Sequence, residues 1–255
     1  DESHFANLAD LLDDSILTPL GHELFENYSD YKSSRKDWES AYREGLDLLG
    51  FKYEQTSEPF KGASGATHPV LAEAVTQFQA QAYKELLPAG GPVRTIVVGQ
   101  ETPDIRQQAE RVKEFMNYQI TEVMEEYDPD LDQLLFYLPL AGSAFKKVYY
   151  DGAIGRAVSK FVPAEDLIIP YYATDLDSCE RITHSVKMMG NDLRKLQVSG
   201  FYRDIDIMKP KEEKSDIGQK YDELEGRVDD YQNNMTVTLL EFHVNLDIIG
   251  FEDLD

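Results

Sequence analysis

The chain of 255 residues has a single cysteine, Cys179, and no apolar run long enough to cross a lipid bilayer. One cysteine excludes a disulfide bond within the chain and favours a reducing compartment. The missing apolar run gives no reason to expect a membrane partner. Composition therefore favours an intracellular protein.

Basic residues are also few, because 25 Lys and Arg stand against 48 Asp and Glu, and the net charge is −23. An acidic chain repels phosphate, so the basic footprint of a protein that grips nucleic acid is absent. The small clusters Lys146-Lys147 and Lys209–Lys211 do not change this. Two explanations remain open: acidity that serves solubility, and an acidic surface that avoids DNA or binds a basic partner.

Patterns that carry chemistry are scarce. Residues 62–65 have the glycines of a phosphate-binding loop but neither the following Lys nor a preceding strand. No Gly-x-Ser-x-Gly sequence is present, and Cys179 has no nucleophile motif around it. The five histidines lack metal-ligand spacing; they are His4, His22, His68, His184 and His243. We therefore predict no catalytic, cofactor-binding or metal-binding residue, and no enzyme. His184 and His243 alternate with apolar residues, which predicts partly buried, hydrogen-bonded side chains.

Two groups of aspartates need separate treatment. Asp128, Asp130 and Asp132 resemble the start of a calcium loop, but Gln133 replaces the required glycine and Pro139 the bidentate glutamate. An acidic helix start explains them better. The Asp-x-Asp pairs at 175–177 and 204–206 are of the kind that holds magnesium, and chance alone produces such pairs in a chain this acidic.

With 42% hydrophobic and 11% aromatic residues, the chain has enough apolar side chains for a sizeable core. A period of 3.6 residues predicts helices over residues 3–17, 34–49, 68–86, 102–127, 131–141 and 191–198. A period of two predicts strands over residues 93–98, 144–151, 157–162, 167–169, 181–188 and 236–249. The expected fold class is α+β, with amphipathic helices packed on a mainly antiparallel sheet.

Particular residues set the expected boundaries of these helices. Pro19 should end the first helix. Ser34 with Asp37 forms a capping-box pattern that starts the second, and Thr102 caps the longest. The apolar stripe of that longest helix, which includes Met116 and Ile120, is expected to be buried and to pack on the hairpin at 144–162.

The expected domains are an N-terminal helical segment at residues 1–67 and an α+β domain at 68–255. Within the second, residues 204–234 are charged and nearly free of branched apolar side chains, which predicts a mobile acidic loop. The sequence starts without Met and stops just after an apolar stretch, so we expect a piece of a longer chain.

Three motifs occur in a fixed order. Residues 142–151 read Gly-x-x-x-Lys-x-x-Tyr-x-Asp, residues 162–166 read Val-Pro-x-Glu-Asp, and residues 175–184 read Asp-Leu-x-x-x-x-Arg-Ile-x-His. With the helices at 38–49 and 68–86, this order resembles the wing region of portal proteins of tailed bacteriophages, especially those of short-tailed phages. The resemblance covers residues 35–203.

The resemblance implies a structural protein of the virion, assembled in the host cytoplasm. Such proteins form a homo-oligomeric ring of twelve subunits at one capsid vertex, and double-stranded DNA passes through the ring without sequence specificity. The ring contacts the major capsid protein, the terminase packaging motor and the tail adaptor proteins, and has no catalytic activity of its own. The chain would be truncated before the stem and clip of the family.

Two other functions stay open from the residues alone. One is a magnesium-dependent hydrolase that uses Asp175 and Asp177 with Asp204 or Asp206. The other is an acidic adaptor that binds a basic partner through residues 204–234.

Overall fold

The computed structural model describes residues 12–50, 60, 62, 68–152, 154–206, 217, 220, 224, 236–246 and 248. The chain divides into two compact units. Unit 1 consists of residues 1–43 and 165–255, and unit 2 of residues 44–164. The predicted α+β class is confirmed, because both units combine helices with antiparallel strands.

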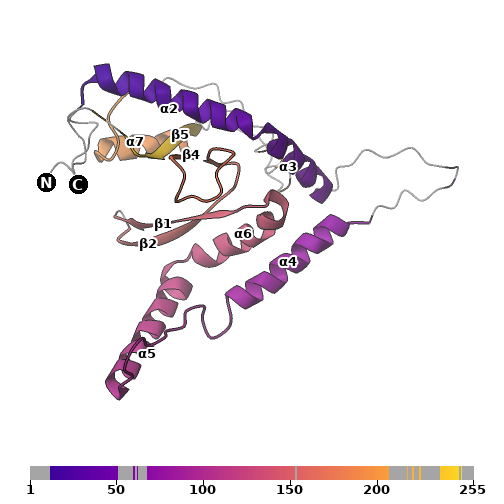
Figure 1. Cartoon of the computed structure of the whole chain (residues 1–255), viewed down its shortest axis with the longest axis vertical. Coiled ribbons are helices and arrows are strands. Elements are labelled where there is room, and N and C mark those ends of the chain that lie inside the picture. The colour runs from indigo at the N-terminus through magenta and orange to yellow at the C-terminus, as the bar shows by residue number, and fades with distance from the viewer. Residues whose placement is uncertain are drawn as a thin grey trace. The chain divides into compact units, whose positions relative to one another are not determined.

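Unit 1 is built on a three-stranded antiparallel sheet in the order β3-β4-β5 (Figure 1). In this sheet His184 of β4 lies opposite Leu167 of β3 on one side and Glu241 of β5 on the other. Helix α2 contacts β3, and α7 follows β4 directly. The elements are α2 (Asp14–Ser34), β3 (Leu167–Ile168), β4 (Arg181–Met189), α7 (Gly190–Val198) and β5 (Thr236–Val244). Helix α3 spans Lys36–Leu49, and its residues up to Arg43 belong to this unit.

Unit 2 consists of helices and one hairpin (Figure 1). Its elements are the end of α3 (from Glu44 on), α4 (Val70–Leu86), α5 (Pro103–Tyr118), the π-helical turn η2 (Gln119–Val123), α6 (Tyr127–Ala141), β1 (Phe145–Asp151) and β2 (Arg156–Val162). Strands β1 and β2 pair antiparallel, with Val148 opposite Ser159. Helix α6 packs against α4 and against β2.

The core of unit 2 is centred on α6. Its buried side chains are Leu131, Leu135, Tyr137 and Ala141. They are joined by buried side chains of the neighbouring elements, namely Leu46, Leu49, Val75, Val158 and Val162. The Tyr137 ring stacks on Phe161 of β2, with 6.3 Å between the ring centroids. Apolar burial of this kind contributes roughly 25 cal/mol per Å², so α6 and β2 form the stable part of the unit.

Two predicted helix boundaries at the N-terminal side are wrong. Pro19 lies inside α2 and does not end it. A proline removes only one helical hydrogen bond, and the half-buried stripe of Leu20, Leu24, Tyr28 and Tyr31 continues the helix beyond it. Ser34 is the last residue of α2, and its hydroxyl donates to the carbonyl of Tyr31 at 2.7 Å, so it does not start the next helix.

The predicted helix at 102–127 is divided in the structure. Thr102 caps its start as predicted, because its Oγ1 accepts the N–H of Ile105 at 3.3 Å. Helix α5 ends at Tyr118, the π-helical turn follows, and α6 begins at Tyr127. A π-helical turn inserts an extra residue and rotates the following side chains. The apolar positions on its two sides therefore do not share one face.

The expected domain division at residue 67 stays a prediction, because most of residues 51–67 lie outside the described part of the chain. Most of the predicted mobile loop at 204–234 lies outside it as well.

Candidate functional site

The three aspartates at the start of α6 fasten neighbouring elements to this helix. Asp130 Oδ2 accepts the backbone N–H of Phe161 in β2 at 2.8 Å. Asp132 Oδ1 accepts the amide of Gln79 in α4 at 2.7 Å. Asp128 accepts the hydroxyl of Tyr83, which raises the pKa of that tyrosine. Each carboxylate faces a different partner, as an architectural role requires.

Glu126, just before α6, also binds strand β2. Its two oxygens lie 2.9 and 2.8 Å from the two terminal nitrogens of Arg156, and Oε1 also accepts the N–H of Ser159 at 3.2 Å. The hydrogen bonds from Arg156 hold the pKa of Glu126 at about 2, below its ordinary value. A paired, hydrogen-bonded carboxylate of this kind favours its charged form.

The aspartates of the magnesium alternative are not gathered into a site. Asp175 accepts the N–H of Ser178 at 2.7 Å and the hydroxyl of Thr174 at 3.1 Å, and these bonds lower its pKa. Asp204 pairs with Arg194. Across the described residues, no group of three or more His, Cys, Asp or Glu side chains is placed to hold a metal ion. The hydrolase stays a prediction without a geometric site.

Cys179 lies in the same turn as Asp175 and is half-buried. Its thiol lies 3.0 Å from the carbonyl oxygen of Asp175. Burial, and then the charge of Asp175, raise the pKa of the thiol. A thiolate, the nucleophilic form, is therefore disfavoured here.

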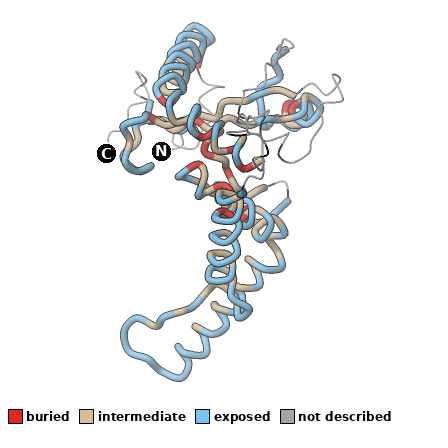
Figure 2. Tube along the Cα trace, turned by 90° about the vertical axis from the view of Figure 1, so that its right-hand side faces the viewer, coloured by how far each residue is buried: buried red, intermediate tan, exposed pale blue. Residues whose placement is uncertain are grey.

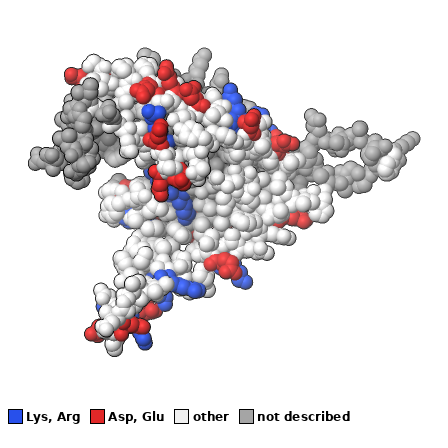
Figure 3. Space-filling view, viewed as in Figure 1, with Lys and Arg blue, Asp and Glu red and all other residues white. Residues whose placement is uncertain are grey.

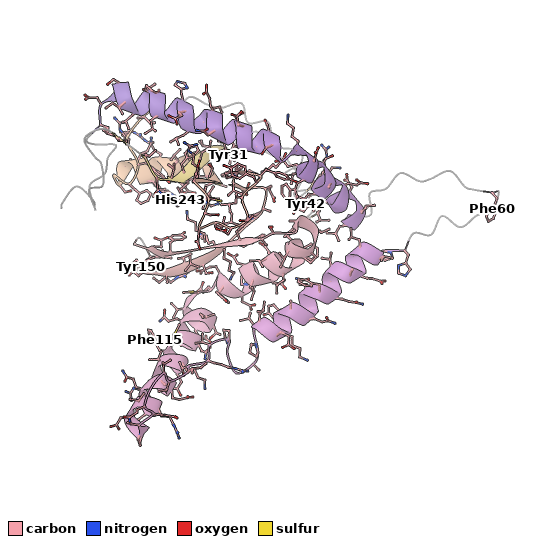
Figure 4. The ribbon with its side chains drawn as sticks, viewed as in Figure 1. Tyr31, Tyr42, Phe60, Phe115, Tyr150 and His243 are labelled. Carbon is pink, nitrogen blue, oxygen red and sulfur yellow. The ribbon has the colours of Figure 1, made fainter. Side chains whose placement is uncertain are left out.

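Two of the histidines share one acidic neighbour on the sheet of unit 1. His184 Nδ1 lies 3.5 Å and His243 Nε2 3.1 Å from a carboxylate oxygen of Glu241. The prediction of a partly buried side chain is confirmed for His184 and wrong for His243, which is exposed on β5 (Figure 4). His243 follows Glu241 by two residues on an edge strand, and alternation alone did not show that this face is open to solvent.

Sequence reasoning missed Arg35, which lies between α2 and α3 in unit 1 and contacts several other residues. The residue is 7% exposed. Its Nη2 donates to the carbonyl of Glu165 at 2.6 Å, its Nη1 to the carbonyl of Leu167 at 3.0 Å, and its Nε to Glu39 at 2.9 Å. The guanidinium also lies over the Trp38 ring, 5.3 Å from the centroid. Arg35 therefore fixes the Glu-Asp part of the Val-Pro-x-Glu-Asp motif.

The two acids of this corner, Glu165 and Asp166, are half-buried. Desolvation raises the pKa of Glu165 to about 7 and raises the pKa of Asp166 in the same direction. Asp166 also accepts the N–H of Ser185 through its backbone carbonyl at 2.8 Å, so the corner joins β4. An arginine between two helices has no periodic signature, which is why no sequence pattern indicated it.

Helix α5 presents its apolar side chains to solvent. None of its 16 residues is buried, and α5, in the lower part of Figure 2, has no red segment. Phe115 is 61% and Met116 45% exposed, and Ile105 and Val112 are exposed as well. The prediction that this stripe is buried is therefore wrong for Met116. The helix that packs on the hairpin is α6 and not the predicted one.

Residues 93–98 run beside α5 but are not a strand, so that prediction is wrong too. The side-chain amide of Asn117 in α5 bonds both backbone groups of Val93, as a paired strand residue would. Its Oδ1 accepts the N–H of Val93 at 2.9 Å, and its Nδ2 donates to the Val93 carbonyl at 3.2 Å. The hydroxyl of Thr95 donates to the carbonyl of Ala109 at 3.1 Å. The outward side chains of this run are left without cover.

Charge is spread unevenly over the units. Acidic side chains gather along α2 in unit 1, whereas both signs alternate over α5 in unit 2 (Figure 3). None of the helices in the described ranges combines the length and apolar composition needed to cross a bilayer.

Neither the protein-family models nor the curated proteins compared with this chain give a match.

Proposed function

We propose that this chain is a structural subunit of a bacteriophage portal ring, from the outer wing part of the subunit. The proposal has two supports. The first is the order of three motifs over residues 142–184. The second is the α5 face, which carries the argument because it is a surface that a lone chain leaves incomplete.

The apolar side chains of α5 lie on one side of the helix. Ile105, Val112 and Met116 are separated by 7 and 4 residues, which is the spacing of a single helical face, and Phe115 lies beside them. Complete burial of a fully exposed apolar side chain of this size gains about 1.5–3 kcal/mol, and these half-exposed side chains would gain part of that in a contact. Contiguous exposed apolar residues are the mark of a protein interface. A second copy of the same chain is the partner that a homo-oligomeric ring supplies.

The acidity of the chain supports the same proposal. A channel through which DNA slides has to avoid tight phosphate contacts, and negative charge weakens such contacts. In the ring, double-stranded DNA would pass without sequence-specific contacts. The major capsid protein, the terminase motor and the tail adaptors are its further proposed partners. ATP hydrolysis belongs to the motor, so the portal subunit itself needs no active site.

The complete protein, with any segments that flank this chain, tests the proposal. Mass photometry and negative-stain electron microscopy should show closed rings. The double variant Val112→Asp/Met116→Asp should shift the complete protein toward smaller species, because it places two charges on the proposed contact. Circular dichroism should show that its secondary structure is unchanged.

The matched control is Gln107→Asp, which adds one charge to the opposite side of α5 and should leave the assembly intact. A complete protein that stays monomeric at every accessible concentration would contradict the proposal. Rings that tolerate the double variant would show that α5 is not part of the contact.

A further inference from the structure

The two edges of the β1–β2 hairpin differ. The outer edge of β2 is covered, because the N–H groups of Ser159 and Phe161 donate to the carboxylates of Glu126 and Asp130. The side chain of Arg156 likewise reaches the carbonyl of Ala157 at 3.2 Å. An open strand edge attracts other strands, and proteins normally cover it. Here only one of the two edges is covered in this way.

The edge of β1 is open. Because the N–H groups of Ser159 and Phe161 point away from β1, their opposite residues Val148 and Lys146 also point their backbone groups away from β2. Tyr150 follows by the same alternation. Within the described part of the chain β2 is the sole strand paired with β1, so three N–H and three C=O groups of β1 face outward.

The side chains beside this open edge are apolar and exposed. Val148 is 68% and Tyr150 70% exposed, and Tyr150 lies on the hairpin away from the α6 end (Figure 4). Lys146, on the same face, is held at the α6 end, where its ammonium group lies 3.7 Å from the centroid of the Tyr127 ring. An added strand would meet Val148 and Tyr150 directly.

Residues 94–98, Arg-Thr-Ile-Val-Val, also have backbone groups that pair with no strand in the described part of the chain. Four of the five are β-branched, their exposure alternates along the run, and in the described structure their backbone makes no hydrogen bond to another backbone group. Thr95 and Val97 face α5, whereas Arg94, Ile96 and Val98 face outward, and Ile96 and Val98 are 87% and 94% exposed. The alternation is that of a strand with one covered face and no neighbouring strand.

We infer that residues 94–98 of one copy pair with the open edge of β1 in a neighbouring copy. The inference depends on the proposed ring and names its contact. The occupant is a second copy because the same chain carries both an unpaired edge and an unpaired strand-like segment. Such pairing is strand addition, in which backbone hydrogen bonds bind and alternate side chains select the register.

Charge and side-chain shape select an antiparallel register. With Ile96 opposite Val148, Arg94 comes to lie beside Tyr150 and near Asp151, while Val98 lies opposite Lys146. The parallel arrangement would place Arg94 beside Lys146, and like charges directly opposite each other destabilise a sheet. The antiparallel register also continues the apolar row of Val148 and Tyr150 with Ile96 and Val98.

The two surfaces are different parts of the chain, so the contact is heterologous. A heterologous contact repeats from copy to copy and closes into a ring when the rotation per copy divides a full turn. A symmetric dimer would instead pair one surface with itself. The inferred contact is therefore of the kind that a ring of identical subunits requires.

Mixed cysteine variants of the complete protein test the pairing. In a Cys179→Ser background, Ile96→Cys and Val148→Cys are made separately, mixed before assembly and oxidised. Directly opposite strand residues have Cα atoms about 5.5 Å apart, within the range of a disulfide bond. The mixture should give disulfide-linked dimers in denaturing gels, well above either variant alone. Replacing Val148→Cys by Tyr149→Cys, whose side chain points to the other face, should remove most of the product.

Amide hydrogen exchange gives a second measurement that needs no substitution. On assembly, the amides of residues 94–98 and of Lys146, Val148 and Tyr150 should slow by at least about tenfold. Rings that form with neither cross-link nor slowed exchange would overturn the strand pairing and leave the ring proposal standing. Failure of the complete protein to assemble, measured separately by mass photometry, would overturn both.

Discussion

Helices α5 and α6 follow one another in the chain, are 16 and 15 residues long, and have opposite surroundings. The periodicity of α5 is the cleaner of the two, yet α5 buries none of its residues. Helix α6 contains Pro139 and has less regular apolar spacing, yet it forms the centre of its unit. Amphipathic periodicity therefore shows that a face requires a partner, and does not show whether the partner lies in the same chain.

The backbone polar groups around α6 and around α5 differ in the same way as the apolar side chains. Around α6 and β2, the carboxylates of Glu126 and Asp130 accept the outward N–H groups of the strand. Around α5, no described residue supplies such an acceptor to the run 94–98, and among the described strands only β2 pairs with β1. A region that satisfies both its apolar and its polar groups is stable alone, whereas a region that satisfies neither is suited to a contact between copies.

The largest expected effect is a loss of folding stability when a charge is placed in α6, compared with the same change in α5. Leu135 is 2% exposed, so Leu135→Asp would bury an unpaired charge at a cost of several kcal/mol and should abolish the cooperative unfolding transition of this chain. Met116→Asp should change the free energy of unfolding by about 0.5 kcal/mol or less, because the side chain is already exposed. Urea denaturation followed by circular dichroism measures both. Equal destabilisation by the two changes would remove the contrast.

A smaller effect is expected from the link between α6 and β2. Glu126→Gln removes the charge that pairs with Arg156, and should reduce stability at pH 7 by about 1.5–3 kcal/mol, as expected for hydrogen bonds to a charged group. The folded pKa of about 2 is below the ordinary value, so this contribution is present above about pH 5 and is lost as the pH falls through 2.

Urea denaturation of both proteins between pH 2 and pH 7 measures that dependence. The two stabilities should converge toward the acidic end. Glu122→Gln, an exposed carboxylate in the adjacent π-helical turn, is the control and should leave the curve unchanged. A constant difference at every pH would show that Glu126 acts through its shape and not through its charge.

Local patterns in the sequence predicted most elements of the fold. The hairpin at 145–162, the strand at 181–189 and the cap at Thr102 depend on alternation and capping, which are properties of a few neighbouring residues. The continuation of α2 through Pro19 was not predictable in this way, because the tendency of proline to end a helix competes with an apolar stripe that continues beyond it. The break at η2 also depends on how the following helix packs.

The proposed contact surfaces were less predictable. The same repeat of apolar residues describes a buried stripe and an exposed one, so the exposure of Met116 could come only from the structure. Arg35 was missed because its partners are the backbone carbonyls of Glu165 and Leu167, about 130 residues away in sequence. What the sequence did indicate at 93–98 was a strand-like run, and the structure adds that no strand in the described ranges pairs with it.

The smallest expected effect tests how α5 holds that run. Asn117→Ala removes both hydrogen bonds to Val93 and should reduce stability by only about 1 kcal/mol, because the run is exposed on its other face. Exchange of the Val93 amide, measured by NMR, should rise by about tenfold, while amides in α6 stay unchanged. Asn117→Asp keeps the acceptor and should retain most of the protection at Val93. If Asn117→Ala also accelerated exchange in α6, the two regions would be one cooperative structure, and the surface of α5 would no longer be independent of the core.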